Sequence, residues 1–420
     1  MPDPGNGLFS PFSIGTLSIP GRVIKTATSE TRATADGVAG PSHVEFYEPM
    51  AMAGTPLIIT GNIYTSRDGQ STPHQMGADD DMKIAGLAEL TRAVHRRGSR
   101  IFAQLSHAGR QVVPGFVGLS EAVSASDVKE LTIGTRPRPL SVEEIARIVE
   151  EFGEAARRCR DAGFDGVQIH AGHGYLISQF LTPYTNRRTD GYGGSPEKRL
   201  RLLREVHRAI RARTGGDFPV IVKLNGDDAL PLRAGLKTGA LVEVARQMAA
   251  DGIDAVEVSV GHYESGFPVV RGSFRRCLRG MVDGSVRYLP PLRRLGFTVT
   301  WPLLAVACDL LWPRAEGYNL RFARAFKAAL SIPVICVGGL HSRARMEAAI
   351  ADGDCDAISC GRAFIADPFL YRHLRESRPG PACVYCNACV GVIGSQALDC
   401  FHPEVRRQKD AMLAGEVRAA

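Results

Sequence analysis

The segment SVEEIARIVEEFGEAARRCRDAGFDGVQIH, residues 141–170, contains one complete helix–strand unit of this 420-residue chain. Ser141 begins the helical part, glutamates occupy its first turn, and Gly163 ends it, as in a capped amphipathic helix. The strand part, residues 165–170, is almost continuously apolar, which indicates a parallel strand buried on both faces. This unit therefore predicts an α/β protein with a parallel sheet.

The same unit repeats along the chain. Seven further apolar runs alternate with helix-like segments: RVIKTA (22–27), PLIITG (56–61), SRIFAQL (99–105), PVIVKL (219–224), DAVEVSV (254–260), PVICVG (333–338) and DAISCG (356–361). Eight strand–helix units predict a (β/α)8 barrel. A doubly wound sheet is the alternative, but no G-x-G-x-x-G motif follows any of these strands, so the dinucleotide-binding signal is missing.

Composition and charge narrow the function classes. Hydrophobic residues make up 44% of the chain, which is enough for a large core. The net charge of +7 is spread along the chain and favours anionic small molecules over nucleic acid. The N-terminus has no basic region followed by an apolar run, and no uncharged apolar stretch reaches 18 residues, so we expect neither a secretory signal nor a membrane span. The ten cysteines then indicate a reducing cytoplasm.

Two regions interrupt the repeat. Residues 266–325 form an over-long connection after the sixth strand, in which an arginine-rich part precedes the apolar part FTVTWPLLAVACDLLWPRAEG. We expect either a helical excursion packed on the barrel or a lid over a hydrophobic substrate. Contact with a membrane surface is less favoured, because the arginines precede the apolar run and do not interleave with it. The second region is a cysteine-rich extension, residues 376–420, which follows a barrel domain of residues 1–375.

Side chains able to do acid–base chemistry follow the predicted strand ends, where a barrel has its active site. His170 ends the fourth strand, and His173 and Tyr175 lie on the loop that follows. Two histidine N–H groups can hold and polarise a carbonyl oxygen, and a nearby tyrosine can deliver a proton to carbon. A His-x-x-His pair alone is equally typical of core or capping histidines. For His262, which ends the sixth strand, a substrate contact and a structural role are equally expected.

Other strand ends predict a site for a phosphorylated heterocycle. Gln104 on the third strand can hydrogen-bond a planar ring, and Lys223 on the fifth directs a cation into the same mouth. The loops after strands 7 and 8 are where barrels bind phosphate, and they contain Gly338, Gly339, Gly361 and Arg362. This combination describes FMN, although isolated glycine turns also have a plain structural explanation.

With these motifs the sequence resembles the old yellow enzyme family of FMN-dependent ene-reductases. The resemblance rests on IHAGHGYLISQFLTPYTNRRTDGYGGSPEKR, AQLSHAGR, PVICVGG and CGRAFIADP, and extends to about residue 375. It implies that His170 and His173 bind the activating oxygen of an enone or enoyl-type substrate and that Tyr175 donates the proton. It also implies NAD(P)H as the hydride donor and binding of the FMN phosphate by the glycine turns and Arg362.

The resemblance assigns further roles around the flavin ring. Gln104 would contact the ring, Asn62 would neighbour it, and Lys223 stands where the family usually has an arginine near flavin N1 and O2. Lysine keeps the charge but lacks the bidentate fork of arginine. The first strand departs from the family pattern, with Ala27 in place of a frequent proline and Ser29 in place of threonine or cysteine. The serine hydroxyl can still bond flavin O4.

Four cysteines of the extension follow the pattern C-x2-C-x2-C-x10-C: Cys383, Cys386, Cys389 and Cys400. Thiolates at this spacing suit a [4Fe–4S] cluster or tetrahedral zinc, and free thiols are the third possibility. The quartet resembles that of a family branch with 2,4-dienoyl-CoA reductase and trimethylamine dehydrogenase, in which a [4Fe–4S] cluster lies beside FMN, although the last spacing is short here. The other six cysteines are expected to be buried or incidental.

The same branch bears on the source of electrons. There, FAD- and nucleotide-binding domains follow the cluster, whereas this sequence ends about 20 residues after Cys400. We therefore expect reduction by NAD(P)H directly or by a separate donor protein. The favoured function is an FMN-dependent oxidoreductase that reduces an activated alkene, with a hydrophobic small molecule as substrate. An oxidative dehydrogenase or demethylase and a flavin/iron–sulfur electron-transfer module are the alternatives, and a homo-oligomer is left open.

Overall fold

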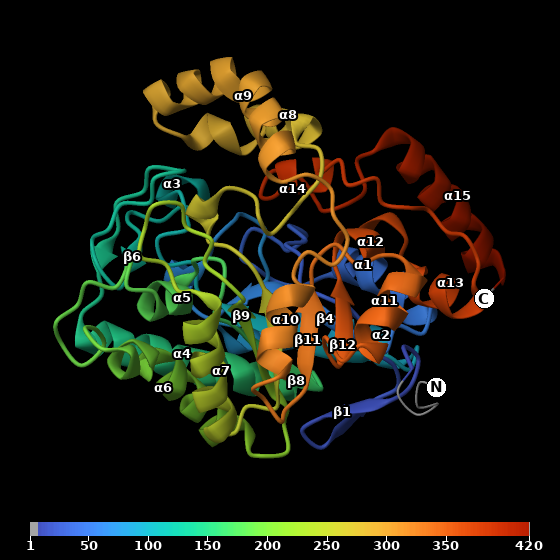
Figure 1. Ribbon diagram of the computed structural model, residues 1–420, viewed down its shortest axis with the longest axis horizontal. Coiled ribbons are helices and arrows are strands. Elements are labelled where there is room, and N and C mark those ends of the chain that lie inside the picture. The colour runs from blue at the N-terminus through green and yellow to red at the C-terminus, as the bar shows by residue number, and fades with distance from the viewer. Residues whose placement is uncertain (1–6, 420) are drawn as a thin grey trace.

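The structure, a computed structural model, describes residues 7–419, so the first six residues of the segment tested for a secretory signal lie outside it. Eight parallel strands form a closed barrel in chain order (Figure 1). They are β3 (Val23–Lys25), β4 (Leu57–Tyr64), β5 (Arg100–Ser106), β8 (Gly166–His170), β9 (Val220–Asn225), β10 (Ala255–Ser259), β11 (Val334–Val337) and β12 (Ala357–Cys360). The prediction of a (β/α)8 barrel is confirmed.

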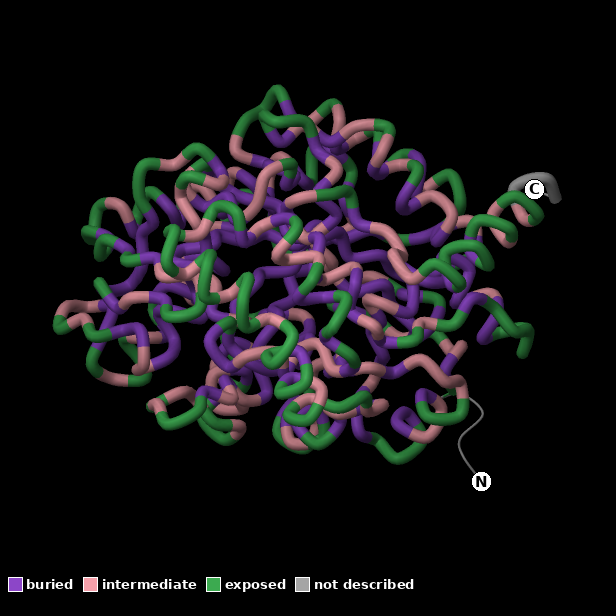
Figure 2. The backbone as a smooth tube through the Cα atoms, turned by 90° about the horizontal axis from the view of Figure 1, so that it is seen from above, coloured by how far each residue is buried: buried purple, intermediate pink, exposed green. Residues whose placement is uncertain are grey.

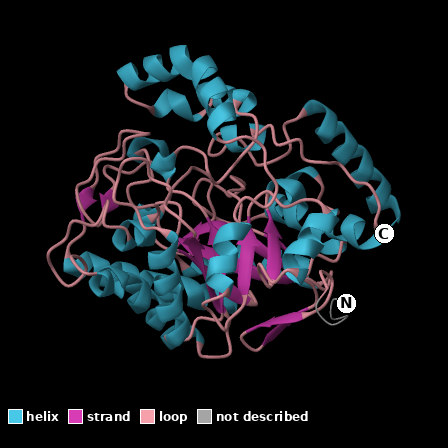
Figure 3. Ribbon diagram, viewed as in Figure 1, coloured by secondary structure: helices cyan, strands magenta, loops and turns pink. Residues whose placement is uncertain are grey.

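Helices surround the strands on the outside of the barrel (Figure 3). The helix predicted over residues 141–163 is α4 (Val142–Asp161). Its N-cap Ser141 accepts a hydrogen bond from Glu144 N, and the Glu144 carboxylate accepts one from Ser141 N, which satisfies donors that a helix start leaves unpaired. The other surrounding helices are α1 (Pro41–Met52), α2 (Ile84–His95), α6 (Pro196–Thr214), α7 (Thr238–Ala250), α10 (Leu320–Lys327), α11 (Arg343–Ala351) and α13 (Leu370–Glu376).

The lower half of the barrel interior is apolar. Phe102, Ile221 and Ile335 belong to one buried cluster there, and Phe102 occupies the space that Gly166 leaves open, since a Cβ on Gly166 would lie 2.6 Å from the Phe102 ring. Seen from above, buried segments gather at the centre of the molecule and exposed segments at its rim (Figure 2). The antiparallel pair β1 (Phe12–Ile14) and β2 (Leu17–Ile19), which the sequence analysis did not predict, packs on this cluster and closes the barrel floor.

The next inward layer, toward the C-terminal strand ends, is polar and fully buried: Gln104, Gln168, Lys223, Glu257 and Ser359. Strand register sets Gln104 beside Gln168 and Glu257 beside Lys223. Each member makes a hydrogen bond or an ion pair within the layer. Buried polar groups that are paired in this way avoid the cost of an unsatisfied donor or charge, so the layer can form the floor of a site.

The insertion after β10 folds as a helical hairpin outside the barrel. It contains α8 (Arg275–Asp283), the turn η4 (Ser285–Tyr288) and α9 (Pro291–Leu311), while the last residues of the expected 266–325 region already belong to α10. In Figure 1, α8 and α9 form the outermost layer at the top of the molecule. They share a small core: Phe274, Cys277, Leu278, Ala305 and Cys308.

The C-terminal extension, with α14 (Ala388–Gly391) and α15 (Pro403–Ala419), folds back onto the barrel. Leu398 N donates to Glu30 O over 2.8 Å, and Arg32 Nη2 donates to Leu398 O over 2.7 Å. On its other side α14 packs against α8, where a Cβ on Gly391 would lie 2.2 Å from the carbonyl oxygen of Cys277. The cysteine-rich segment therefore lies between the insertion and the loop that follows β3.

One helix of the described chain, α9, is long and apolar enough by composition to cross a membrane. The sequence analysis expected no span, because it required an uncharged stretch, and α9 contains Arg293, Arg294 and Asp309. Only 11% of the apolar stretch of α9 is buried inside the protein, so α9 is not a core helix. All ten cysteines are free, and the six outside the quartet are buried as expected.

Candidate active site

Three side chains that the sequence analysis selected lie together where β8 ends. His170 Nε2 lies 3.1 Å from His173 Nδ1, and the Tyr175 ring stands edge-on to the His170 ring with centroids 4.4 Å apart. His173 and Gly174 both have left-handed backbone conformations, with φ of 58° and 81°. This sharp turn brings His173 and Tyr175 back beside the strand end, so one cluster contains all three groups.

Neighbouring strands fix His173 from two sides. Its Nε2 lies 2.7 Å from Ser259 Oγ at the end of β10, and its backbone N–H donates to Asn225 Oδ1 at the end of β9 over 3.0 Å. The sequence analysis did not select Ser259 or Asn225. Both occupy inward positions two residues after Glu257 and Lys223, so the alternation of a strand would have indicated them.

Burial keeps this cluster uncharged. Burial, followed by the charge of Lys223, lowers the pKa of His173 to about 3, and burial lowers the pKa of His170 well below its ordinary value. Burial also raises the pKa of Tyr175, so the phenol keeps its proton at neutral pH. Two neutral imidazoles and a protonated phenol can donate hydrogen bonds but are poor bases.

A buried carboxylate that the sequence analysis missed organises the floor below the cluster. Glu257 Oε2 lies 3.0 Å from Lys223 Nζ and accepts from Gln168 Nε2 over 2.7 Å, while its Oε1 accepts from Thr26 Oγ1 over 2.6 Å. Although burial alone would raise it, these partners lower the pKa of Glu257, so the carboxylate is ionised. Gln104 is linked to Glu257 through Gln168, because Gln168 Oε1 accepts a hydrogen bond from Gln104 Nε2 over 2.6 Å. The predicted pair Gln104 and Lys223 thus belongs to one network.

The segment after β3 lines the same mouth. Ala27 and Ser29 are half-buried, whereas every residue of β3 itself is buried. Ser29 Oγ donates to Asn62 Oδ1 over 2.8 Å, so two residues predicted near the flavin ring are in contact. Half-exposed side chains at the centre of a barrel leave room for a ligand, which fits the ring pocket that the sequence predicts.

The glycine turns after β11 and β12 offer free donors. In the described chain, no backbone N–H of the four predicted phosphate residues donates to a loop or turn carbonyl: Gly338, Gly339, Gly361 and Arg362. Arg362 Nη1 donates to Arg271 O over 2.7 Å. Arg271 Nε and Asn387 Nδ2 nearby are buried without a partner in the described chain. Unused N–H groups beside two guanidinium groups fit a phosphate, and Arg271 is a candidate that the sequence analysis did not select.

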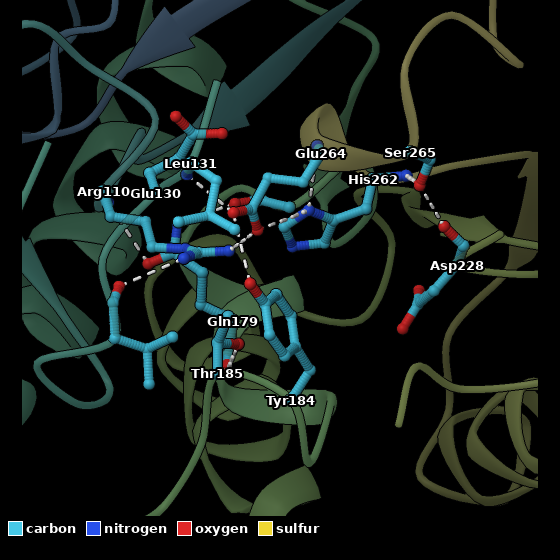
Figure 4. Close-up of polar contacts among 12 residues, drawn as sticks. Arg110, Glu130, Leu131, Gln179, Tyr184, Thr185, Asp228, His262, Glu264 and Ser265 are labelled. Atoms are coloured by element: carbon cyan, nitrogen blue, oxygen red, sulfur yellow. Dashed lines mark hydrogen bonds and ion pairs between the residues drawn. The ribbon is translucent and has the colours of Figure 1, made fainter. Parts of the chain in front are cut away.

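A buried ion pair joins two loops at the rim of the mouth (Figure 4). Arg110, after β5, pairs with Glu264 in the turn η3 (Tyr263–Ser265) after β10. Glu264 Oε1 also accepts from Tyr184 Oη over 3.2 Å. His262 precedes this turn, and a Cβ on Gly174 would lie 2.6 Å from its Nε2. His262 therefore packs beneath the turn that contains His173, and burial and the charge of Arg110 lower its pKa to about 3.

The four cysteines of the extension are free and half-buried. Burial raises the pKa of Cys389 to about 12, and the charges of Cys383, Cys386 and Cys400 add to this effect. Cys277 of α8 packs against Gly391, two residues after Cys389. Within residues 7–419, however, no group of three or more His, Cys, Asp or Glu side chains has a geometry that could hold a metal ion. The predicted cluster is therefore not shown.

A cavity of about 680 Å³ lies elsewhere, between α13 and α15, with His373, Gln408, Met412 and Glu416 among its lining residues. Its lining includes no strand residue and none of His170, His173 and Tyr175. The barrel mouth instead combines converging donors, a buried charge pair and unused N–H groups. The mouth of the barrel is therefore the candidate active site.

A barrel whose mouth combines these groups is typical of enzymes that bind a phosphorylated ligand. The chain belongs to the NADH:flavin oxidoreductase / NADH oxidase family, whose family model matches residues 7–279 and 313–380. The resemblance to old yellow enzymes is thereby confirmed. Residues 280–312, which contain η4 and α9, fall between the two matched segments.

Individual relatives support the same assignment. The chain is 33% identical to an NADH oxidase of Thermoanaerobacter brockii over 91% of this chain and 53% of that protein, so it spans about half of that relative's length. A 2-naphthoyl-CoA reductase in complex with 2-naphthoyl-CoA matches with a TM-score of 0.79 at 25% identity, over 96% of this chain and 58% of that chain. The old yellow enzyme homologue from Zymomonas mobilis matches with a TM-score of 0.69 at 26% identity, over 89% and 93%.

Proposed function

We propose that this protein is an FMN-dependent, NAD(P)H-linked oxidoreductase that reduces the C=C bond of an activated alkene. The observation that carries the proposal is the cluster of His170, His173 and Tyr175, in which two neutral imidazoles 3.1 Å apart lie against a protonated phenol. When bound, FMN supplies the hydride for the β-carbon of the alkene. The chain's own residues hold the substrate oxygen and supply the proton.

The residues at the mouth suit the two ends of FMN. Lys223 and Gln104, in the polar floor, would face the polar edge of the ring, and Ala27, Ser29 and Asn62 would line its other side. The unused N–H groups after β11 and β12, with Arg362, would bind the phosphate: Gly338, Gly339 and Gly361. These assignments rest on the free donors and on the half-exposed segment after β3.

The histidine pair would polarise the substrate carbonyl. A Ser259 hydroxyl that donates to His173 Nε2 leaves the imidazole proton on Nδ1, which points toward His170 Nε2. In the free protein His170 Nε2 accepts this hydrogen bond. A substrate oxygen would replace that contact and accept from His173 Nδ1 and, once the His170 proton is on Nε2, from His170 as well, so that both N–H groups stabilise the negative charge that develops there. Tyr175, whose raised pKa keeps its proton available, would then protonate the α-carbon, and solvent would restore the phenol.

The protonation states also favour reduction over the oxidative alternatives. A dehydrogenase or demethylase needs a group that removes a proton from its substrate. The imidazole of His173, with a pKa lowered to about 3, is a weak base, and Tyr175 holds its own proton. An electron-transfer module without substrate chemistry would have no use for a converging donor pair.

We further propose that the cysteine quartet holds a [4Fe–4S] cluster, supplied with electrons by NAD(P)H through the flavin or by a separate donor protein. All four thiols are free, and the Arg362 guanidinium of the predicted phosphate site lies 4.6 Å from the ring centre of Tyr385, which is between Cys383 and Cys386. Zinc or free thiols are the outcomes that would overturn this part.

The first test is the absorption spectrum of protein purified without oxygen, before and after dithionite. Flavin bands with a broad shoulder that bleaches support FMN with a cluster, and flavin bands alone support FMN with zinc or free thiols. Titration with a phenol then tests the donor pair, because phenolate bound over the flavin gives a long-wavelength band. We expect the band in the native protein and none in His170→Ala/His173→Ala. A protein that takes up no FMN, or a double variant with unchanged phenol affinity, would overturn the proposed function.

A further inference from the structure

The insertion helix α9 carries an apolar stripe that no part of the described chain covers. Its inner face, with Phe297, Trp301, Ala305 and Cys308, packs in the small core shared with α8. The opposite face presents aliphatic side chains that are 60% to 85% exposed: Leu292, Leu295, Val299, Leu303, Val306 and Leu310. Spacings of three and four residues place these side chains on one side of a helix, so the stripe runs for roughly 27 Å at 1.5 Å per residue.

A stripe of this size indicates an interaction surface. Single exposed aliphatic residues are normal on soluble proteins, but a contiguous apolar patch of this length marks a place where another apolar surface binds. The stripe belongs to residues 280–312, which the family model does not match. The flavin chemistry common to the family therefore does not explain it.

Arginines accompany the stripe in space. Residues 271–294 contain one acidic residue, Asp283, and seven arginines: Arg271, Arg275, Arg276, Arg279, Arg287, Arg293 and Arg294. In the sequence they precede the apolar run, but the hairpin folds α8 alongside α9. The Arg279 guanidinium lies 5.9 Å from the ring centre of Trp301, on the inner face of α9. Since a helix is about 10 Å wide, the α8 arginines lie about one helix diameter behind the stripe.

We propose that α9 docks the protein on the surface of a lipid bilayer that contains anionic lipids. The aliphatic stripe would enter the boundary between headgroups and acyl chains, to a depth of about 5–10 Å. At that depth the α8 arginines reach the level of the headgroups, where they attract anionic lipids. The sequence analysis disfavoured membrane contact because the arginines do not interleave with the apolar run, and the hairpin supplies that proximity through the fold.

The anchoring of α9 makes it an interfacial helix and not a spanning one. Its inner face is covered by α8, Arg293 Nη1 donates to Leu131 O over 2.8 Å near its start, and Trp312 O accepts from Gly272 N over 3.0 Å at its end. A helix held to the protein along its length cannot enter the bilayer core. Charge argues for lipid over a second copy of this chain, because anionic headgroups offer the arginines negative partners and a second stripe offers none.

Docking through α9 would also turn the mouth of the barrel toward the membrane. The Tyr288 ring of η4 lies 4.4 Å from the Phe116 ring, which belongs to the loop after β5 at the rim of the mouth. The insertion therefore stands beside the mouth on the side that would face lipid (Figure 1). The docking surface itself does not depend on the flavin chemistry, so the two can fail separately.

Vesicle flotation of the intact protein tests the proposal. The vesicles are pure phosphatidylcholine or equal parts phosphatidylcholine and phosphatidylglycerol. We expect about tenfold more protein to float with the anionic vesicles, because several arginines add their attraction to that of the stripe. Leu295→Asp/Leu303→Asp should lower this binding by about tenfold or more, since a charge at this depth is costly. Arg275→Gln/Arg276→Gln should weaken binding to anionic vesicles only.

The matched control places the same two charges at other exposed aliphatic side chains. Met82 and Leu232 are at least as exposed as the stripe residues and lie outside α9, so Met82→Asp/Leu232→Asp should float as the native protein does. Native protein that stays unbound with both vesicle types would overturn the proposal, as would stripe variants that bind like the native protein. Sedimentation gives one further contrary outcome: a native dimer that the stripe variants convert to monomers would assign the stripe to a second copy of the chain.

Discussion

Replacement of Tyr175 by phenylalanine separates proton delivery from every other property of the mouth. The substitution removes one hydroxyl and leaves the ring that stands edge-on to His170 at 4.4 Å. The histidine pair keeps its 3.1 Å contact and its anchor to Ser259, because neither passes through the phenol. The variant should therefore bind flavin and phenols as the native protein does.

The size of the expected effect follows from burial. Because burial raises the pKa of Tyr175, the phenol is protonated at neutral pH and no nearby histidine is charged to replace it as an acid. Loss of a positioned general acid slows the step it serves by about 10²–10⁴-fold. Stability should change little, because a typical hydrogen bond contributes only about 0.5–1.5 kcal/mol.

Stopped-flow absorption measures the two half-reactions separately. Reduction of the flavin by NAD(P)H should be unchanged in Tyr175→Phe, whereas reoxidation by an enone should slow by the factor given above. Tyr184→Phe is the matched control, because its hydroxyl is bonded to Glu264 at the rim and is not part of the cluster. Equal reoxidation rates in native protein and Tyr175→Phe would remove Tyr175 as the acid. Equal slowing in both variants would show a general disturbance of the mouth.

Three further perturbations test the network, the buried histidines and the cysteine quartet. Lys223→Met should lower the free energy of unfolding by about 3–5 kcal/mol, because it leaves the buried Glu257 carboxylate charged and without its partner. Denaturant titration measures this loss, which should be smaller for Lys223→Arg. His173 and His262 have pKa values lowered to about 3, so between pH 7 and pH 5 they stay neutral in the folded state while the unfolded chain binds protons. Each should therefore lower the free energy of unfolding by about 2 kcal/mol between pH 7 and pH 5. His262→Asn should make the free energy of unfolding depend less on pH, as measured by thermal melts at several pH values. Cys389→Ser should abolish the iron content and the dithionite-sensitive shoulder with flavin retained, and unchanged iron would exclude Cys389 as a ligand.

The barrel could be predicted from the sequence because its strands are buried on both faces. Each then appears as a nearly continuous apolar run, and helices such as α4 show both caps and a period of 3.6 residues. The pair β1 and β2 gave no comparable signal, since strands of three residues are too short for a period to appear. Its place on the barrel floor is set by tertiary contacts of Ile14 and Ile19, with Phe12 and Leu17 packed beside them.

The site was predictable where chemistry is concentrated in a motif and not where it depends on pairing between strands. His170, His173 and Tyr175 lie within six residues of one another, so the sequence alone grouped them. Glu257 is one polar residue in an apolar run, and its role depends on strand register that brings it beside Lys223. In the same way, the arginines of α8 reach α9 only through the hairpin, which is why the sequence argued against a membrane surface.

The polar floor also explains how a lysine can stand where the family usually has an arginine. An ammonium group has three N–H donors, and Lys223 directs two of them downward, to Glu257 Oε2 and to Thr26 Oγ1, each at 3.0 Å. One donor is left for the ring of a bound flavin, whereas an arginine would present a fork of two. The carboxylate holds the ammonium group in place, and the stability loss expected for Lys223→Met measures that same contact. A single donor would stabilise negative charge at flavin N1 and O2 less than a fork does, so Lys223→Arg should raise the flavin potential, and an unchanged potential would show that Lys223 does not face the ring.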